Sequence, residues 1–298
     1  MTKSNGRRVR VLVGAILLGG LLFECQRALT SDGTLVPAVA VEGPRRGANV
    51  ALAAPSPDLK EKIPTVEELA GKDPIAFLQR ALDNYDRSVR DYTCIFTKQE
   101  MVNGRMTEEQ VMKADFRERP FSVRLEWIKN MDKASRVLYV ADRWVKDGKQ
   151  LAVVEPGAIA RLFVSHVMRE INGKDAQKSS RRSIDQFGLR NSLALVIKYA
   201  KMGLDQGVGT FAYVGNGKVN ERETLVFERH LPYTDESGEW PDRVLIVHLD
   251  KELLLPTLCA AYADEAKENL LGRYMTTDVK INANLDDEVF TKKGMGIE

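Results

Sequence analysis

The chain has 298 residues and an almost balanced charge, with 44 Lys and Arg against 42 Asp and Glu. Its 44% of hydrophobic residues is typical of a globular protein and excludes low-complexity disorder and collagen. The small net charge lacks the basic excess of proteins that bind nucleic acid through phosphates, so we expect no nucleic-acid partner. Residues 1–63 carry nine basic and five acidic residues, so the remainder of the chain is slightly acidic.

The amino terminus has the layout of an export signal. Four basic residues lie within the first ten positions and precede an uncharged apolar run at 11–23. A helix of that length reaches about 20 Å, whereas the hydrocarbon core of a bilayer is about 30 Å thick. This favours a signal peptide at 1–27, with an uncleaved membrane anchor as the alternative. We therefore expect an exported protein of the periplasm or cell envelope.

Residues 28–63 mix Gly, Pro, Ala and Ser without a sustained period, which predicts a flexible linker before a single domain at 64–298. Cys94 and Cys259 are the cysteines of that domain. An oxidising compartment permits a disulfide between them. Because each lies in an apolar, strand-like run, two unpaired buried thiols are the other interpretation.

The first half of the domain begins with a helix at 74–90, because Asp73-Pro74 is an N-cap followed by Pro at the first helical position. The period then changes to two, and turn signals at Asn103-Gly104 and Asp147-Gly148 separate alternating apolar runs. Strands are expected around 92–97, 112–116, 121–127, 137–140 and 151–154.

Residues 155–183 lack a regular pattern and carry the basic residues Lys174, Lys178, Arg181 and Arg182. Asp185 is the predicted cap of a second helix, whose apolar stripe includes Leu189 and Leu193. Strands follow at about 211–214, 225–227, 243–250, 256–264 and 271–282, with a turn at Asn216-Gly217 between the first two.

Tight turns between sequential strands exclude repeated βαβ units and predict an α+β fold with an antiparallel sheet. About ten strands curl on themselves, and two apolar-striped helices need an apolar surface. We therefore expect a curved antiparallel sheet that forms an open or half-closed barrel, with the helices over its concave face.

Patterns of catalysis are missing from the sequence. It has no nucleophile elbow, no Gly-rich phosphate loop and no zinc-protease motif. The three histidines, His166, His230 and His248, have no Cys, Asp or His at metal-ligand spacing. We therefore predict a protein that is not an enzyme, with no cofactor and no metal.

Several segments together resemble an exported bacterial family, domain of unknown function 1571. The resemblance covers about residues 74–290 and is carried by Asp91-Tyr92-Thr93-Cys94, residues 116–123, residues 137–140, Asp147-Gly148-Lys149, residues 187–191, Leu255-Pro256 and residues 282–290. That family resembles in turn the LolA/LolB-like lipoprotein-sorting superfamily. The resemblance implies an unclosed antiparallel barrel whose helices cover an apolar cavity that takes acyl chains.

The surplus of apolar faces predicts a non-catalytic envelope protein that binds a hydrophobic ligand, a lipid or acyl chain, between sheet and helices. The candidate cavity residues are Met112, Phe116, Phe121, Val123, Leu125, Trp127 and Leu193. Lys174, Lys178, Arg181 and Arg182 are the candidates for contact with an anionic headgroup or a membrane surface. The alternative is an envelope scaffold or protein-interaction module with a filled core and no ligand, whose partner would be an envelope protein.

Overall fold

The computed structural model describes residues 64–131, 133–236 and 238–297, so the predicted signal and linker lie outside the described residues. Contacts between residues group Glu61–Glu298 into one unit. The domain boundary at residue 64 and the state of the signal stay predictions. None of the helices in the described part of the chain has the length and hydropathy of a membrane span.

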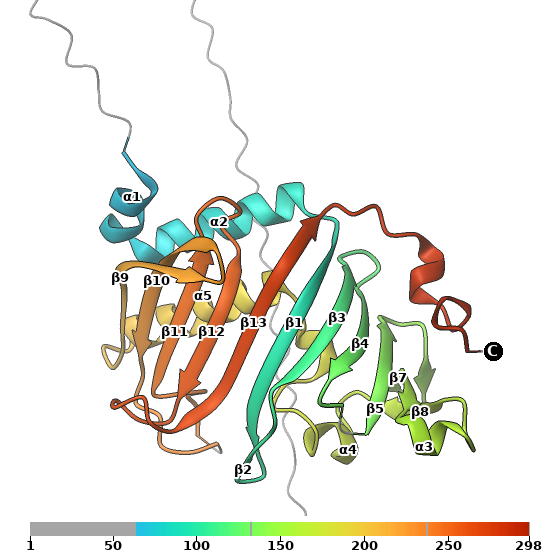
Figure 1. Ribbon diagram of the computed structural model, residues 1–298. Helices are drawn as coiled ribbons and strands as arrows, with labels where there is room; N and C mark the ends of the chain where they lie inside the picture. The colour runs from blue at the N-terminus through green and yellow to red at the C-terminus, as the bar shows by residue number, and fades with distance from the viewer. Residues whose placement is uncertain (1–63, 132, 237, 298) are drawn as a thin grey trace, which may run out of the picture. The chain divides into compact units, whose positions relative to one another are not determined.

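Thirteen strands form one sheet, and every neighbouring pair that is described runs antiparallel (Figure 1). In chain order they are β1 (Asp91–Val102), β2 (Arg105–Met106), β3 (Gln110–Arg117), β4 (Ser122–Lys129), β5 (Ala134–Val140), β6 (Val145–Lys146), β7 (Lys149–Pro156), β8 (Val167–Glu170), β9 (Thr210–Val219), β10 (Arg222–His230), β11 (Val244–Asp250), β12 (Pro256–Tyr262) and β13 (Leu270–Ile281). The order across the sheet is β6-β7-β5-β4-β3-β1-β13-β12-β11-β10-β9, with β2 paired to β1 and β8 to β7. Since β6 and β9 do not pair with each other among the described strands, the sheet is open. The predicted α+β class with an unclosed antiparallel sheet is confirmed.

Alternating side chains give the sheet one apolar face, as the period of two predicts. Met112 of β3 lies opposite Trp127 of β4, and Phe116 lies opposite Val123. Met112, Phe116 and Val123 are all at most 1% exposed. We call the face that carries these residues the inner face. It is the concave face on which the helices were expected.

Helices α2 (Pro74–Ser88) and α5 (Leu189–Asp205) pack against each other and against strands of the sheet. Asp73 caps α2 as predicted, because its Oδ1 accepts a hydrogen bond from the Ala76 N–H at 2.9 Å. The remaining helices are α1 (Val66–Lys72), α3 (Ala158–Arg161), α4 (Lys174–Gln177) and the short 3-10 helices η1 (Ile184–Gln186), η2 (Asp287–Phe290) and η3 (Lys293–Met295). The segment predicted to be irregular therefore contains α3, β8 and α4.

The start of α5 differs from the prediction. Asp185 lies in η1, and the N-cap of α5 is Gly188, which has a φ of 117°. The Leu189 N–H donates instead to the Tyr92 hydroxyl, 3.2 Å away on β1. A hydroxyl from the sheet thus satisfies a helix end that no neighbouring side chain caps. Glycine is required here, since a Cβ would lie 3.1 Å from the Phe116 ring.

The turn predicted at Asn216-Gly217 is also displaced. β9 continues through both residues to Val219, and the turn that follows it contains Asn220, which has a positive φ. A Cβ at Gly217 would lie 2.9 Å from Val226 and 3.0 Å from His248. Glycine is therefore present at this position for close cross-strand packing, which a sequence pattern cannot distinguish from a turn.

The order of the strands explains why one long segment crosses the inner face. β1 to β8 form one antiparallel series, and β9 to β13 form a second that returns to pair β13 with β1. The first series ends at one edge of the sheet, whereas β9 begins the second at the opposite edge. The chain between them, residues 171–209, must therefore cross the sheet. We call residues 171–188 the crossing segment, and α5 completes the crossing (Figure 1).

Candidate ligand-binding cavity

A cavity of about 650 Å³ lies between the inner face of the sheet and the crossing segment with α5. Its size is within the range of about 300–1,000 Å³ that small-molecule sites occupy. Alternate residues of β1, from Tyr92 and Cys94 to Phe96, line it. The opposite wall comes from Ser192 and Leu195 of α5 together with residues of the crossing segment.

One half of the cavity, beneath β3, β4, β5, β7 and β8, is mainly apolar, although Gln110 of β3 and Arg169 and Glu170 of β8 also line it. Its walls include Met112, Leu125, Trp127, Val137, Ala152, Val154, Val164 and Val167. The one polar atom of the Trp127 ring is hydrogen-bonded, because Nε1 donates to Oε1 of Gln110 at 3.2 Å. This half therefore presents hydrocarbon to whatever occupies it.

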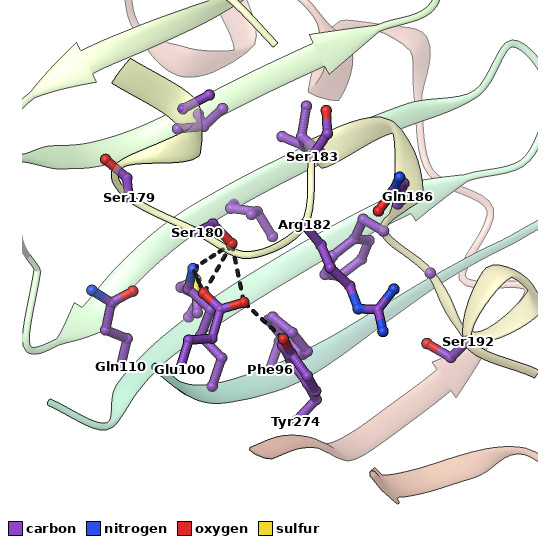
Figure 2. Close-up of a pocket in the computed structure, with 18 of the residues that line it drawn as sticks. Phe96, Glu100, Gln110, Ser179, Ser180, Arg182, Ser183, Gln186, Ser192 and Tyr274 are labelled. Carbon is purple, nitrogen blue, oxygen red and sulfur yellow. Dashed lines mark hydrogen bonds and ion pairs between the residues drawn. The ribbon is translucent and has the colours of Figure 1, made fainter. Parts of the chain in front are cut away.

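The other half of the cavity contains a buried carboxylate, Glu100, at the inner face of β1. Its oxygens accept hydrogen bonds from Lys98 Nζ at 2.8 Å, from Tyr274 of β13 at 2.8 Å and from Ser180 of the crossing segment at 2.9 Å (Figure 2). The Arg181 backbone N–H adds a fourth donor at 3.3 Å. Glu100 thus fastens the crossing segment to two adjacent strands.

Burial alone would raise the pKa of the Glu100 carboxyl, but the Lys98 ammonium and the hydrogen bonds from Tyr274 and Ser180 outweigh it and hold that pKa below its usual value. The Tyr274 pKa is raised, first because the phenol is buried and second because the Glu100 carboxylate is close. Glu100 is therefore ionised and Tyr274 neutral at physiological pH.

A second buried pair lies at the β10 side of the cavity. Arg229 Nη2 donates to the Asp242 carboxylate at 2.9 and 3.0 Å, and Arg229 and Asp242 are each 2% exposed. Arg229 Nε and Thr257 Oγ1 are buried without a hydrogen-bond partner among the described residues. Both residues line the cavity. This end of the cavity is therefore polar and holds unused donors.

The predicted cavity residues divide into two groups. Met112, Leu125 and Trp127 line the cavity. Phe116, Phe121, Val123 and Leu193 are not among its lining residues and pack in the core instead. Phe116 stacks on Tyr92 with 4.8 Å between ring centroids, and Phe121 packs edge-on against Phe116. Leu193 faces α2, where it is 0% exposed.

The four basic candidates also differ in position. Lys178 and Arg182 line the cavity, whereas Lys174 and Arg181 do not. Arg181 instead forms an ion pair with Glu236 at 3.0 Å. Their role at a headgroup or a membrane stays a prediction.

Cys94 and Cys259 are both free thiols on the inner face. β13 lies between their strands, β1 and β12. Two strand spacings separate the backbones by about 10 Å, which exceeds the Cα distance of about 7 Å that a disulfide allows. The structure therefore corresponds to the interpretation with unpaired thiols. Burial raises the pKa of Cys259 to about 11 and raises that of Cys94 as well.

None of the described residues around the cavity is a histidine. His166 contacts Lys292, His230 contacts Glu228 and Glu265, and His248 contacts Thr224. Within the described residues, no group of three His, Cys, Asp or Glu side chains could hold a metal.

Sequence reasoning missed Glu100, Tyr274 and Ser192. The sequence did contain a signal for Glu100. Lys98 and Glu100 continue the alternation that turns Tyr92, Cys94 and Phe96 toward the inner face. A Lys and a Glu on an otherwise apolar face indicate a buried pair. Tyr274 and Ser192 carry no comparable local signal, because β13 and α5 bring them to the cavity only in the folded chain.

The model of the family called Protein of unknown function (DUF1571) matches residues 89–294. The chain belongs to this family. No curated protein matches the sequence.

Several solved structures are similar to this chain. A DUF1329 family protein from Desulfovibrio piger is 12% identical over 74% of this chain and 99% of its own, with a TM-score of 0.38. The MucA/MucB complex from Pseudomonas aeruginosa contains a chain that is 16% identical over 74% of this chain and 61% of its own, with a TM-score of 0.41. A LolA superfamily protein from Nitrosomonas europaea is 10% identical over 73% of this chain and 98% of its own, with a TM-score of 0.24. At these TM-scores the likenesses bear on neither ligand nor partner.

Proposed function

We propose that this protein is a non-catalytic protein of the cell envelope that binds a lipid or acyl chain in its cavity. The observation that carries the proposal is the cavity of about 650 Å³, with its apolar half beneath β3 to β8. Each CH₂ group moved from water into such an environment contributes about 0.8 kcal/mol. A chain of several methylenes therefore binds without a polar contact to the apolar half.

The alternative, an interaction module with a filled core, requires the space between sheet and helices to be packed by side chains. Protein interiors are close-packed and hold few voids larger than a water molecule. A cavity of about 650 Å³ is far larger than such a void and supports a binding protein.

The chemistry of the cavity supports binding rather than catalysis. Burial raises the pKa of the Cys259 thiol to about 11, so this potential nucleophile is protonated at neutral pH. No histidine among the described lining residues is available to activate it.

An exposed apolar segment next to the cavity supports contact with a membrane surface or an envelope protein. Ile159, Leu162 and Phe163 are 79%, 81% and 84% exposed. Their neighbours Ala160 and Val164 line the cavity. Large apolar side chains grouped in this way mark interaction surfaces in soluble proteins. This segment is therefore our candidate for the place where the ligand is received or delivered.

Lipid extraction tests the proposal directly. Protein purified without detergent from an envelope fraction should release a lipid or acyl compound that mass spectrometry identifies. A preparation that retains no lipid, and that takes up none from vesicles, would contradict the proposal.

Filling the cavity provides a matched test. Val154→Phe adds a ring within the apolar half, so we expect at least a tenfold loss of affinity for a fluorescent apolar probe. Val214→Phe makes the same change on β9 at a position that is 56% exposed and outside the cavity lining, and should leave probe binding unchanged. Equal affinities of the two variants would exclude the cavity as the binding site.

A further inference from the structure

Among the described residues that line the cavity, positively charged side chains outnumber negatively charged ones. Six of them are cations and four are carboxylates. Each carboxylate has a cation within 4 Å: Glu100 has Lys98, Glu170 has Lys149, Asp175 has Arg169 and Asp242 has Arg229. Three lining cations, Lys133, Lys178 and Arg182, have no carboxylate within this distance among the described residues. Among the described lining residues, the cavity thus has unpaired cations and no unpaired carboxylate.

Arg182 is the unpaired cation next to the polar half of the cavity. Its guanidinium carbon lies 6.0 Å from the centre of the Tyr274 ring, and in Figure 2 the side chain points toward Ser192 of α5. The Ser192 hydroxyl has no hydrogen-bond partner among the described residues, and the buried Arg229 Nε and Thr257 Oγ1 also lack one. The cavity that Arg182 lines therefore holds unused hydrogen-bond donors.

A guanidinium binds a carboxylate or a phosphate through two parallel hydrogen bonds, and such charged bonds are stronger than neutral ones. The Tyr274 ring beside Arg182 and the enclosure of the cavity lower the local dielectric, which strengthens the attraction of an anion to the guanidinium. A neutral hydrocarbon would leave these donors unused. An anionic oxygen group would satisfy them.

We propose that the ligand is an amphiphile with an anionic head, and that Arg182 and Ser192 bind its carboxylate or phosphate group while its chain lies along β3, β4, β5 and β7. The inference rests on the proposed function, because it assigns a direction and a charge to a ligand of the same cavity. The mainly apolar half suits the chain and the polar end suits the head, so the two have separate places.

Paired ligands of equal chain length test the head group. Hexadecanoic acid, hexadecyl phosphate and hexadecanol compete against a neutral naphthylamine probe bound to the purified protein at neutral pH. The two anionic ligands should displace the probe at about tenfold lower concentrations than the alcohol. Acetate and inorganic phosphate, which carry the anionic group without a hydrocarbon chain, should not displace the probe.

Variants locate the anion site. Arg182→Gln should reduce the advantage of the acid over the alcohol to about one, and Arg182→Lys should restore part of it. Arg80→Gln is the matched control, since Arg80 is exposed on α2, has no ion pair among the described residues and lies outside the cavity lining. Because the Arg182 guanidinium makes no hydrogen bond to a described residue, we expect both glutamine variants to fold, which thermal unfolding verifies.

The outcomes separate this inference from the proposed function. If the acid and the alcohol bind equally, or if Arg182→Gln keeps the preference for the acid, the anion site is wrong and the apolar cavity still stands. If acetate alone displaces the probe, the site takes a free anion and the amphiphile is wrong. If none of the three long-chain ligands binds, the proposed function itself fails.

Discussion

Glu100 is 1% exposed, yet its carboxylate accepts hydrogen bonds from β1, β13 and the crossing segment. Lys98, which pairs with it, has a side chain that is 12% exposed. A buried charge is tolerated when it is paired and its hydrogen bonds are satisfied, and both conditions hold here. The pair holds the crossing segment over the cavity.

Glu100→Gln should lower the free energy of unfolding by about 3 kcal/mol at neutral pH, because it leaves the Lys98 ammonium without its anion. The pKa of Glu100 is lowered in the folded state. The wild-type carboxylate therefore stabilises the protein fully at pH values above 4.5, the ordinary pKa of a glutamate. That contribution is lost as the pH falls through the lowered pKa. Urea denaturation at several pH values should therefore show a gap between the two proteins that narrows on acidification.

Glu268→Gln is the control for this prediction. Glu268 is exposed, and its side chain has no ion pair among the described residues, so the substitution should change stability by less than about 0.5 kcal/mol. A gap between wild type and Glu100→Gln that stays constant with pH would show that the carboxylate charge does not stabilise the fold.

At the scale of single elements, close packing decides how α5 lies on the sheet. A Cβ at Gly203, in the last part of α5, would lie 2.6 Å from Leu231 and 3.2 Å from the Cα of Gly209. Leu231 is 2% exposed, so it has little room to move. Gly71 in α1 is the opposite case, because its nearest neighbour, Tyr213, would lie at an ordinary 3.7 Å.

The same substitution should therefore have opposite effects at these two glycines. Alanine in place of glycine in a helix gains about 0.5–1 kcal/mol, so Gly71→Ala should raise stability by that amount. At Gly203 the steric cost of overpacking, about 1–3 kcal/mol, exceeds this gain, and Gly203→Ala should destabilise the protein. Thermal unfolding of both variants measures the contrast. Stabilisation by both would mean that helix propensity, and not packing, dominates at Gly203.

At the scale of the whole molecule, the end of the chain covers the outer face of the first series of strands. Phe290 of η2 is 0% exposed and packs with Leu138, Val140 and Val153 of β5 and β7. The guanidinium of Arg117, on β3, lies 4.6 Å from the centre of the Phe290 ring. The last residues thus bind to strands that lie far earlier in the sequence.

Removing this contact should be costly. Phe290→Ala should lower the free energy of unfolding by about 3–5 kcal/mol, as for other buried aromatic residues. Phe163→Ala removes the same ring from a position that is 84% exposed and should change stability by less than about 0.5 kcal/mol. Denaturant unfolding compares the two variants. A small effect of Phe290→Ala would show that the last residues do not stabilise the sheet.

Local patterns predicted most of the architecture. Alternation in β4 and the Asn103-Gly104 turn indicated the antiparallel strands, and Asp73-Pro74 indicated the start of α2. Each of these signals depends only on residues that are close together in the sequence. Met112, Leu125 and Trp127 were found in the same way, since parity places them on the inner face.

Contacts between distant segments decided the rest. Parity does not distinguish Met112, which lines the cavity, from Phe116 on the same face of the same strand, because the Tyr92 and Phe187 rings fill the space next to Phe116. The cap of α5 depends likewise on Tyr92, which is almost a hundred residues earlier in the chain.

The sequence by itself determined which residues face inward, because the period of a strand is set by neighbouring residues. Only the tertiary structure decided where the inner face is packed and where it is hollow. The reason is the strand order. The first series ends at one edge and the second begins at the opposite edge, so residues 171–209 must cross the face, and the cavity lies where that crossing does not fill the space.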